Sequence, residues 1–143
     1  MNIKLRIVVF VLLLTSCNSN KITSIDFHYT EPGISSPSQT SCSSNLFVDL
    51  ENIRYKKITN ENFLNKFEQQ LNDLKKSDEF SINSRIFALI NYKDKNIDTL
   101  CIGEYRGICL NGNILSHNDD FHNLIMDEID FYDKKLYDKL RRN

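Results

Sequence analysis

The sequence predicts an α+β fold, in which a small antiparallel sheet is packed by two amphipathic helices in an order close to βαβββα. Three observations support this class. Apolar residues repeat every second position at residues 25–30, and they repeat at helical spacing in two other segments. Short apolar runs separated by turn residues fill residues 85–115, which predicts a meander of three or four strands.

The first strand is expected at residues 25–30. Ile25, Phe27 and Tyr29 alternate with polar residues there, as in a half-buried strand. A Ser-rich stretch follows at residues 34–45. Its apolar residues repeat neither at the spacing of a strand nor at that of a helix, so a loop is expected, and loops of this length are often binding loops. A second short strand is expected after this loop, at residues 46–50.

The first helix is expected to begin after Thr59 or Asn60, because either side chain can cap an N-terminus. Lys75 and Lys76 would lie in its last turn, where cations complement the helix dipole. Its apolar residues share one face, which we interpret as core packing against the sheet: Phe63, Leu64, Phe67, Leu71 and Leu74.

The meander begins with an almost unbroken apolar run at residues 85–92, which is typical of a strand at the centre of a sheet. A polar turn at residues 93–96 leads to a strand at residues 97–102. Glycines 103 and 107 bracket the next turn. Asn111-Gly112 then predicts a two-residue hairpin turn, because a type I′ turn requires positive φ at both positions.

The second helix is expected to start near Ser116. Apolar residues continue at helical spacing from Phe121 to Leu140, and Asp119 and Asp120 in the first turn match the positive end of the dipole. These features predict one long C-terminal helix that packs on the sheet.

The first 16 residues have the layout of a secretory signal peptide, with Lys4 and Arg6 before an apolar run at residues 7–14. The run is too short for a membrane span, which needs roughly 20 residues. Leu14-Thr15-Ser16-Cys17 resembles the lipobox of bacterial lipoproteins, and the leader and layout resemble small envelope lipoproteins of Bacteroidota-type bacteria. The resemblance implies cleavage before Cys17, a diacylglyceryl group on its sulfur and usually an acyl group, such as palmitate, on its amine. An ordinary signal peptide is the alternative.

The predicted division is a signal peptide at residues 1–16, a lipidated cysteine and tether at 17–24, and a single α+β domain at 25–143. Loss of Lys4 and Arg6 leaves 16 basic against 19 acidic residues, so the net charge changes from −1 to −3. This balance argues against nucleic acid as a partner. The predicted partners are the lipid bilayer, through acylated Cys17, and an envelope protein or glycan. Because no acidic run follows Cys17, we expect the periplasm-facing side of the outer membrane.

Export places the remaining cysteines in an oxidising compartment. Cys101 and Cys109 are equidistant from Tyr105, so a symmetric hairpin would place them opposite each other. A bridge from Cys42 to either one would instead pin the long loop to the sheet and close a larger loop. We favour the loop-to-sheet bridge, and three reduced thiols are the alternative.

Tyr105 and Arg106 lie at the tip of the Gly-bracketed turn and are candidate partner-binding residues, because Tyr and Arg are enriched at binding hot spots. An ordinary hairpin loop is the other interpretation of these residues. The sequence therefore marks this turn as one candidate contact with a partner.

A metal cluster could be read from His117, Asp119, Asp120 and His122, but the H-E-x-x-H spacing is absent, so no metal and no cofactor are predicted. We predict a non-catalytic binding, inhibitor or immunity-type module, with no catalytic residues. The alternative is a small envelope hydrolase that uses His28, or His117 and His122, with nearby acids. A pocket that joins histidine, carboxylate and nucleophile would favour the hydrolase.

Overall fold

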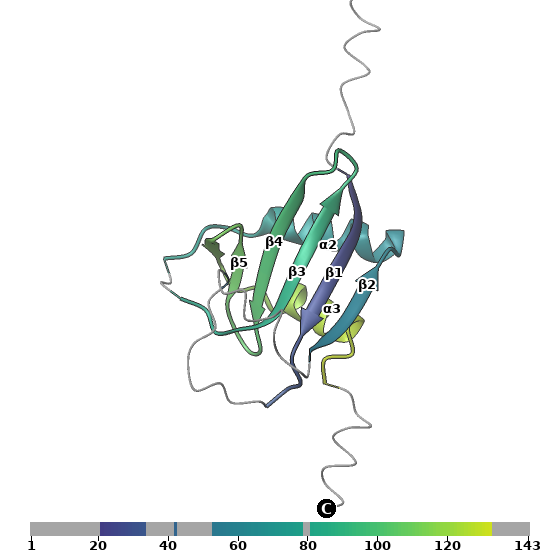
Figure 1. Cartoon of the computed structure of the whole chain (residues 1–143). Coiled ribbons are helices and arrows are strands. Elements are labelled where there is room, and N and C mark those ends of the chain that lie inside the picture. Colours follow the sequence, from purple (N-terminus) through teal and green to yellow (C-terminus); the bar gives the residue numbers. More distant parts are fainter. Residues whose placement is uncertain (1–20, 34–41, 43–52, 79–80, 133–143) are drawn as a thin grey trace, which may run out of the picture.

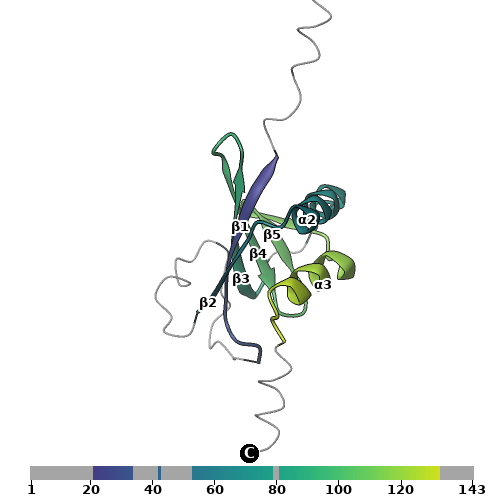
Figure 2. The same cartoon turned by 90° about the vertical axis from the view of Figure 1, so that its right-hand side faces the viewer.

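The computed structural model describes residues 21–33, 42, 53–78 and 81–132, and it confirms the α+β class. Two helices cover one face of a six-stranded antiparallel sheet (Figures 1 and 2). The leader, Cys17, the expected strand at residues 46–50 and the C-terminal residues 133–143 lie outside the described residues. The elements are β1 (Ile22–Tyr29), β2 (Arg54–Ile58), α2 (Glu61–Asp73), β3 (Ser84–Tyr92), β4 (Ile97–Gly103), β5 (Ile108–Leu110), β6 (Asn113–Leu115) and α3 (Asp119–Glu128).

The strands lie in the order β2-β1-β3-β4-β5-β6, and each pair of neighbours is antiparallel. β2 and β3 flank β1 on its two sides, and α2 connects them across the helix-covered face. β3 is an interior strand, as its apolar run predicts. β3 to β6 form the predicted meander, with Asn111 and Gly112 at φ 49° and 81° in the last hairpin turn.

The apolar core lies between the sheet and the two helices. Phe27 of β1, Ile86 of β3 and Phe67 of α2 are fully buried there. The Phe67 and Phe121 rings lie 5.1 Å apart between centroids and join the two helices. Complete burial of such a side chain contributes about 1.5–3 kcal/mol, so this face of the sheet provides the main stabilisation.

Helix α2 begins where the sequence predicts, because the Asn60 side chain accepts a hydrogen bond from the Phe63 N–H (3.1 Å). It ends at Asp73, so the expectation that Lys75 and Lys76 lie in its last turn is wrong. Lys76 instead forms a β-bridge with Leu115 of β6. The segment after α2 therefore pairs with the outer side of β6.

Helix α3 is shorter than expected and ends at Glu128. Asp130 has φ 52°, and the Phe131 N–H donates to the Met126 carbonyl (3.0 Å), which are features of a Schellman C-cap. Glycine is the usual residue at this position of the cap. Because aspartate occupies it here, the sequence gives no signal that the helix ends, and the apolar pattern wrongly predicts a longer helix. No helix in the described part of the chain is both long and apolar enough to span a bilayer.

Strand β2 is missing from the sequence prediction. Arg54–Ile58 contains one strongly apolar residue at its end, and its polar side chains find partners far away in sequence. The Tyr55 hydroxyl donates to Asp26, and the Lys56 ammonium donates to the Glu128 carbonyl. Because these contacts are not local, sequence periodicity does not reveal them.

Candidate functional site

The face of the sheet opposite the helices, here called the open face, has two chemically different halves. At β3 to β6 an apolar group surrounds Cys101 and Cys109. At β1 and β2, together with the end of β3, the side chains are polar: Ser24, Asp26, His28, Tyr55, Lys57 and Asn91. We call this second group the polar half and regard it as the candidate binding site.

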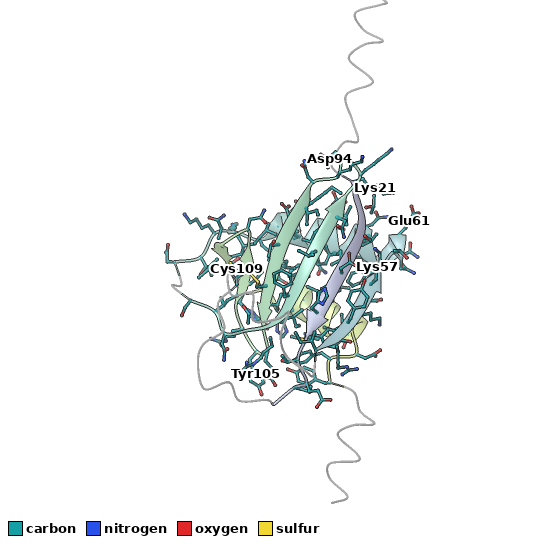
Figure 3. All side chains as sticks on the ribbon, viewed as in Figure 1. Lys21, Lys57, Glu61, Asp94, Tyr105 and Cys109 are labelled. Atoms are coloured by element: carbon teal, nitrogen blue, oxygen red, sulfur yellow. A yellow bond between two sulfur atoms is a disulfide. The ribbon has the colours of Figure 1, made fainter. Side chains whose placement is uncertain are left out.

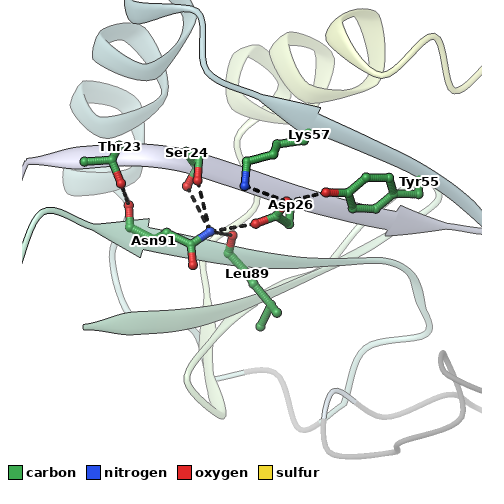
Figure 4. A network of polar contacts seen from close by, with 7 residues as sticks. All are labelled: Thr23, Ser24, Asp26, Tyr55, Lys57, Leu89 and Asn91. Carbon is green, nitrogen blue, oxygen red and sulfur yellow. Dashed lines mark hydrogen bonds and ion pairs between the residues drawn. The ribbon is translucent and has the colours of Figure 1, made fainter. Parts of the chain in front are cut away.

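Asp26 is the centre of the polar half (Figure 4). One carboxylate oxygen accepts the Tyr55 hydroxyl (2.6 Å), and the other accepts the Asn91 side-chain amide (2.7 Å). The Lys57 ammonium lies 3.6 Å from the same carboxylate, and Asn91 also donates to the Ser24 hydroxyl (3.2 Å). The Asp26 side chain of β1 therefore links its own strand to both β2 and β3.

The protonation states of this network follow from its contacts. Burial alone would raise the pKa of Asp26, but the hydrogen bonds from Tyr55 and Asn91 and the charge of Lys57 outweigh it, and the pKa lies below its usual value. The hydrogen bond to Asp26 raises the pKa of Tyr55. At neutral pH the carboxylate is therefore ionised and the phenol protonated, which preserves the hydrogen bond between them.

Three rings form a row across the open face beside Asp26. Tyr55, His28 and Phe87 are cross-strand neighbours on β2, β1 and β3. The His28 ring centroid lies 5.1 Å from that of Tyr55 and 6.4 Å from that of Phe87. Tyr55 is 56% exposed although its hydroxyl is fixed. The row presents an aromatic surface to solvent at the β2 edge of the sheet.

The other half of the open face carries the disulfide. Of the pairings that the sequence leaves open, the structure contains Cys42–Cys101, with 5.6 Å between the Cα atoms. This bridge ties residue 42 of the long loop to β4. Cys109 is buried and free, and it lies opposite Cys101 as the hairpin symmetry predicts. Burial raises the pKa of the Cys109 thiol, which disfavours the reactive thiolate.

Tyr105 and Arg106 are exposed at the tip of the β4–β5 turn, with Tyr105 72% exposed. Gly103 is required there, because a Cβ atom at this position would lie 1.9 Å from the Arg106 carbonyl oxygen. The Glu104 backbone carbonyl accepts the Tyr132 hydroxyl (3.1 Å), and its carboxylate accepts the Gly33 N–H (3.1 Å). The turn is thus fixed from both sides.

The three histidines do not meet at one place. His28 lies on the open face, whereas the rings of His117 and His122 are 5.6 Å apart at α3. His122 hydrogen-bonds the Gly103 carbonyl (3.0 Å), and His117 bonds Asp119 (2.8 Å). Over the described ranges, no group of three His, Cys, Asp or Glu side chains is arranged to hold a metal ion.

A cavity of about 540 Å³ lies beside the end of the sheet that carries the β3–β4 turn. The Tyr92 hydroxyl donates to Asp98 (2.8 Å), and its pKa is raised by burial, by this hydrogen bond and by nearby negative charges. The arrangement favours positively charged groups, and no histidine lines the cavity. The lining residues are Ile22, Glu68, Leu71, Asn72, Tyr92, Asp94, Asn96, Ile97 and Asp98.

Comparison with known proteins gives no relative from which a role could be transferred. No protein-family model matches the chain, and neither a curated protein nor a solved structure matches it. The residues that the sequence suggested for partner binding, Tyr105 and Arg106, are exposed but lie outside the polar half, and their role stays a prediction. Tyr55 and Asn91 were not predicted. The polar residues that alternate with apolar ones in the first strand, Asp26 and His28, were the available signal for this site.

Proposed function

We propose that the protein is a lipid-anchored cell-envelope module that binds a protein partner without catalysis. The anchor is Cys17, supported by the charged and apolar leader and by Leu14-Thr15-Ser16-Cys17. The binding surface is the polar half of the open face, with the exposed Tyr55 ring as its main contact. If the partner is an enzyme, the module is of the inhibitor or immunity type.

The main support for this proposal is that Tyr55 is both exposed to solvent and held in place by its neighbours. The residue is 56% exposed, yet its hydroxyl is held by Asp26 and its ring lies against His28. An exposed aromatic side chain that is already ordered loses little conformational entropy on binding. Tyrosine is also among the residues enriched at hot spots of protein interfaces.

The position of Tyr55 on β2 favours a protein over a glycan. Within the described ranges, β2 pairs only with β1, so its outer edge presents backbone donors and acceptors. A partner strand can add to such an edge, with side-chain contacts supplying specificity. The Tyr55 ring would then lie beside the added strand.

Site-specific photocrosslinking in cells tests the binding surface. A benzophenone side chain at position 55 of the full chain is expected to give a discrete adduct with a protein partner. The matched control is the same group at Asn65, which is exposed on helix α2. Equal adducts at both positions, or adducts with glycan alone, would contradict the proposed surface.

Two substitutions separate the ring from its hydroxyl. Tyr55→Ala is expected to weaken partner binding about 30-fold, as for a hot-spot residue. Tyr55→Phe keeps the ring and loses the bond to Asp26, so a smaller loss is expected. Binding that is unchanged in Tyr55→Ala would show that another surface is used.

The anchor is tested by Cys17→Ala. This variant is expected to leave the membrane fraction with its fold unchanged, because the proposal gives Cys17 the role of lipid attachment alone. Detergent phase partitioning and circular dichroism measure the two properties. Retention in the membrane after a high-salt wash would refute acylation as the anchor.

A further inference from the structure

One end of the sheet lies directly beside the N-terminal tether. Lys21 precedes β1, and its carbonyl accepts the Lys93 N–H (3.0 Å) from the β3–β4 turn. Lys21 and Asp94 appear at one end of the sheet in Figure 3, with Tyr105 at the opposite end. We call Lys21 and the turn at residues 93–96 the tether end.

Chain length limits how far the tether end can be from an anchor at Cys17. Lys21 follows Cys17 by four residues, which span at most about 14 Å when extended. Strand β4 runs from the tether end toward Tyr105, and its seven residues span roughly 23 Å. An acylated Cys17 therefore keeps the tether end near the lipid surface, while the length of the sheet permits Tyr105 to lie far from it.

The surface chemistry of the tether end suits lipid headgroups. Lys93 and Lys95 are exposed at the tip of the turn, and neither has an ion-pair partner among the described residues. The Asp94 carboxylate accepts two hydrogen bonds from Asn96, which hold it in the turn but leave its negative charge. Ile97, next to the turn, is 57% exposed. At the tip of the turn the two ammonium groups outnumber the single Asp94 carboxylate, and this local excess beside an exposed apolar side chain favours an anionic lipid interface. The acidic cavity lined by Glu68 and Asp98 lies next to the tip and is not part of the proposed contact.

We propose that the tether end docks on the lipid surface, with Lys93 and Lys95 against anionic headgroups and Tyr105 directed away from the bilayer. This inference rests on the proposed acylation of Cys17. Tyr55 pairs with His28, six residues along β1 from Ile22, so it stands roughly 20 Å from the tether end. The partner-binding surface is thereby presented away from the membrane.

Tryptophan fluorescence tests the orientation, because the chain contains no tryptophan. Ile97→Trp and Tyr105→Trp each add one reporter at an exposed position, in the acylated full chain reconstituted in phosphatidylglycerol vesicles with nitroxide-labelled headgroups. Ile97→Trp is expected to lose most of its emission and Tyr105→Trp to lose almost none. Equal loss at both positions, or a greater loss at position 105, would overturn the proposal.

The role of the lysines is tested by Lys93→Glu with Lys95→Glu in the Ile97→Trp chain. The loss of emission is expected to shrink in phosphatidylglycerol vesicles and to stay the same in phosphatidylcholine vesicles. An unchanged loss in phosphatidylglycerol would overturn the headgroup contact. Mass spectrometry of Cys17 separates the two proposals, because absence of the acyl group refutes the anchor itself, whereas an acylated chain with the wrong quenching pattern refutes only the orientation.

Discussion

The two faces of the sheet are stabilised in different ways. Toward the helices, Phe27, Phe67 and Phe121 are fully buried in a continuous apolar core. On the open face, one carboxylate network links β1, β2 and β3, and one disulfide ties the long loop to β4. Folding stability therefore resides mainly on the helix-covered face, whereas the described part of the open face carries polar and aromatic side chains.

The largest contrast is expected between a core residue and an open-face residue. Phe67→Ala removes a fully buried ring that contacts Phe121, and it should lower the free energy of unfolding by about 4 kcal/mol. Leu89→Ala on the partly exposed open face should cost less than half as much. Urea denaturation measures both, and equal losses would show that the two faces contribute equally to stability.

The next effect concerns the covalent support of the open face. Cys42→Ala with Cys101→Ala should lower the free energy of unfolding by about 3 kcal/mol, because the bridge closes a loop between residues 59 apart. Cys109→Ala keeps the bridge and serves as the control. A reducing agent should destabilise the wild type and the control but not the double variant; equal sensitivity in all three would argue against the bridge.

A smaller contrast separates two tyrosine hydroxyls. The Tyr29 hydroxyl donates to the Ile129 carbonyl (2.8 Å) in a buried contact that ties β1 to the end of α3. Tyr29→Phe leaves that carbonyl unpaired and should cost about 1–2 kcal/mol in the free energy of unfolding. Tyr55→Phe, at the exposed network, should cost less. The reverse order in urea unfolding would show that the hydroxyl in the open-face network stabilises the fold more than the buried one does.

The smallest effect is a pH dependence. The pKa of Asp26 is lower in the folded chain than its model-compound value of 3.8, so its contribution to stability is present above that pH and is lost as the pH falls through the folded pKa. Asp26→Asn should therefore lose less stability than the wild type between pH 6 and pH 3. Urea midpoints at the two pH values measure the difference, and parallel losses would contradict the assigned pKa direction.

Local sequence signals predicted much of the helix-covered face. Alternation at Ile25, Phe27 and Tyr29 identifies β1, Asn60 identifies the start of α2, and Asn111-Gly112 identifies the last hairpin. Each of these signals depends on residues within a few positions of one another. The same locality explains why the relative positions of Cys101 and Cys109 could be predicted from the turn between them.

The open face was less predictable because its contacts join distant segments. Tyr55 and Asn91 meet Asp26 across strand pairs, and their sequence separations from it are 29 and 65 residues. The choice of Cys101 over Cys109 as the partner of Cys42 likewise depends on the path of a long loop. The end of α3 was missed for a different reason. Asp130 has a positive φ, which glycine usually adopts at a helix C-terminus, so no glycine in the sequence indicates where the helix ends.

The Cys42–Cys101 bridge also determines how the molecule responds to mechanical load. A pulling force between Lys21 and Tyr132 is transmitted through the disulfide, so the chain between the two cysteines carries none of it. Because the two cysteines are 59 positions apart, the extensible contour length falls by about 200 Å. Reduction of this one disulfide would restore that length, so the same chain could be pulled out much further between Lys21 and Tyr132.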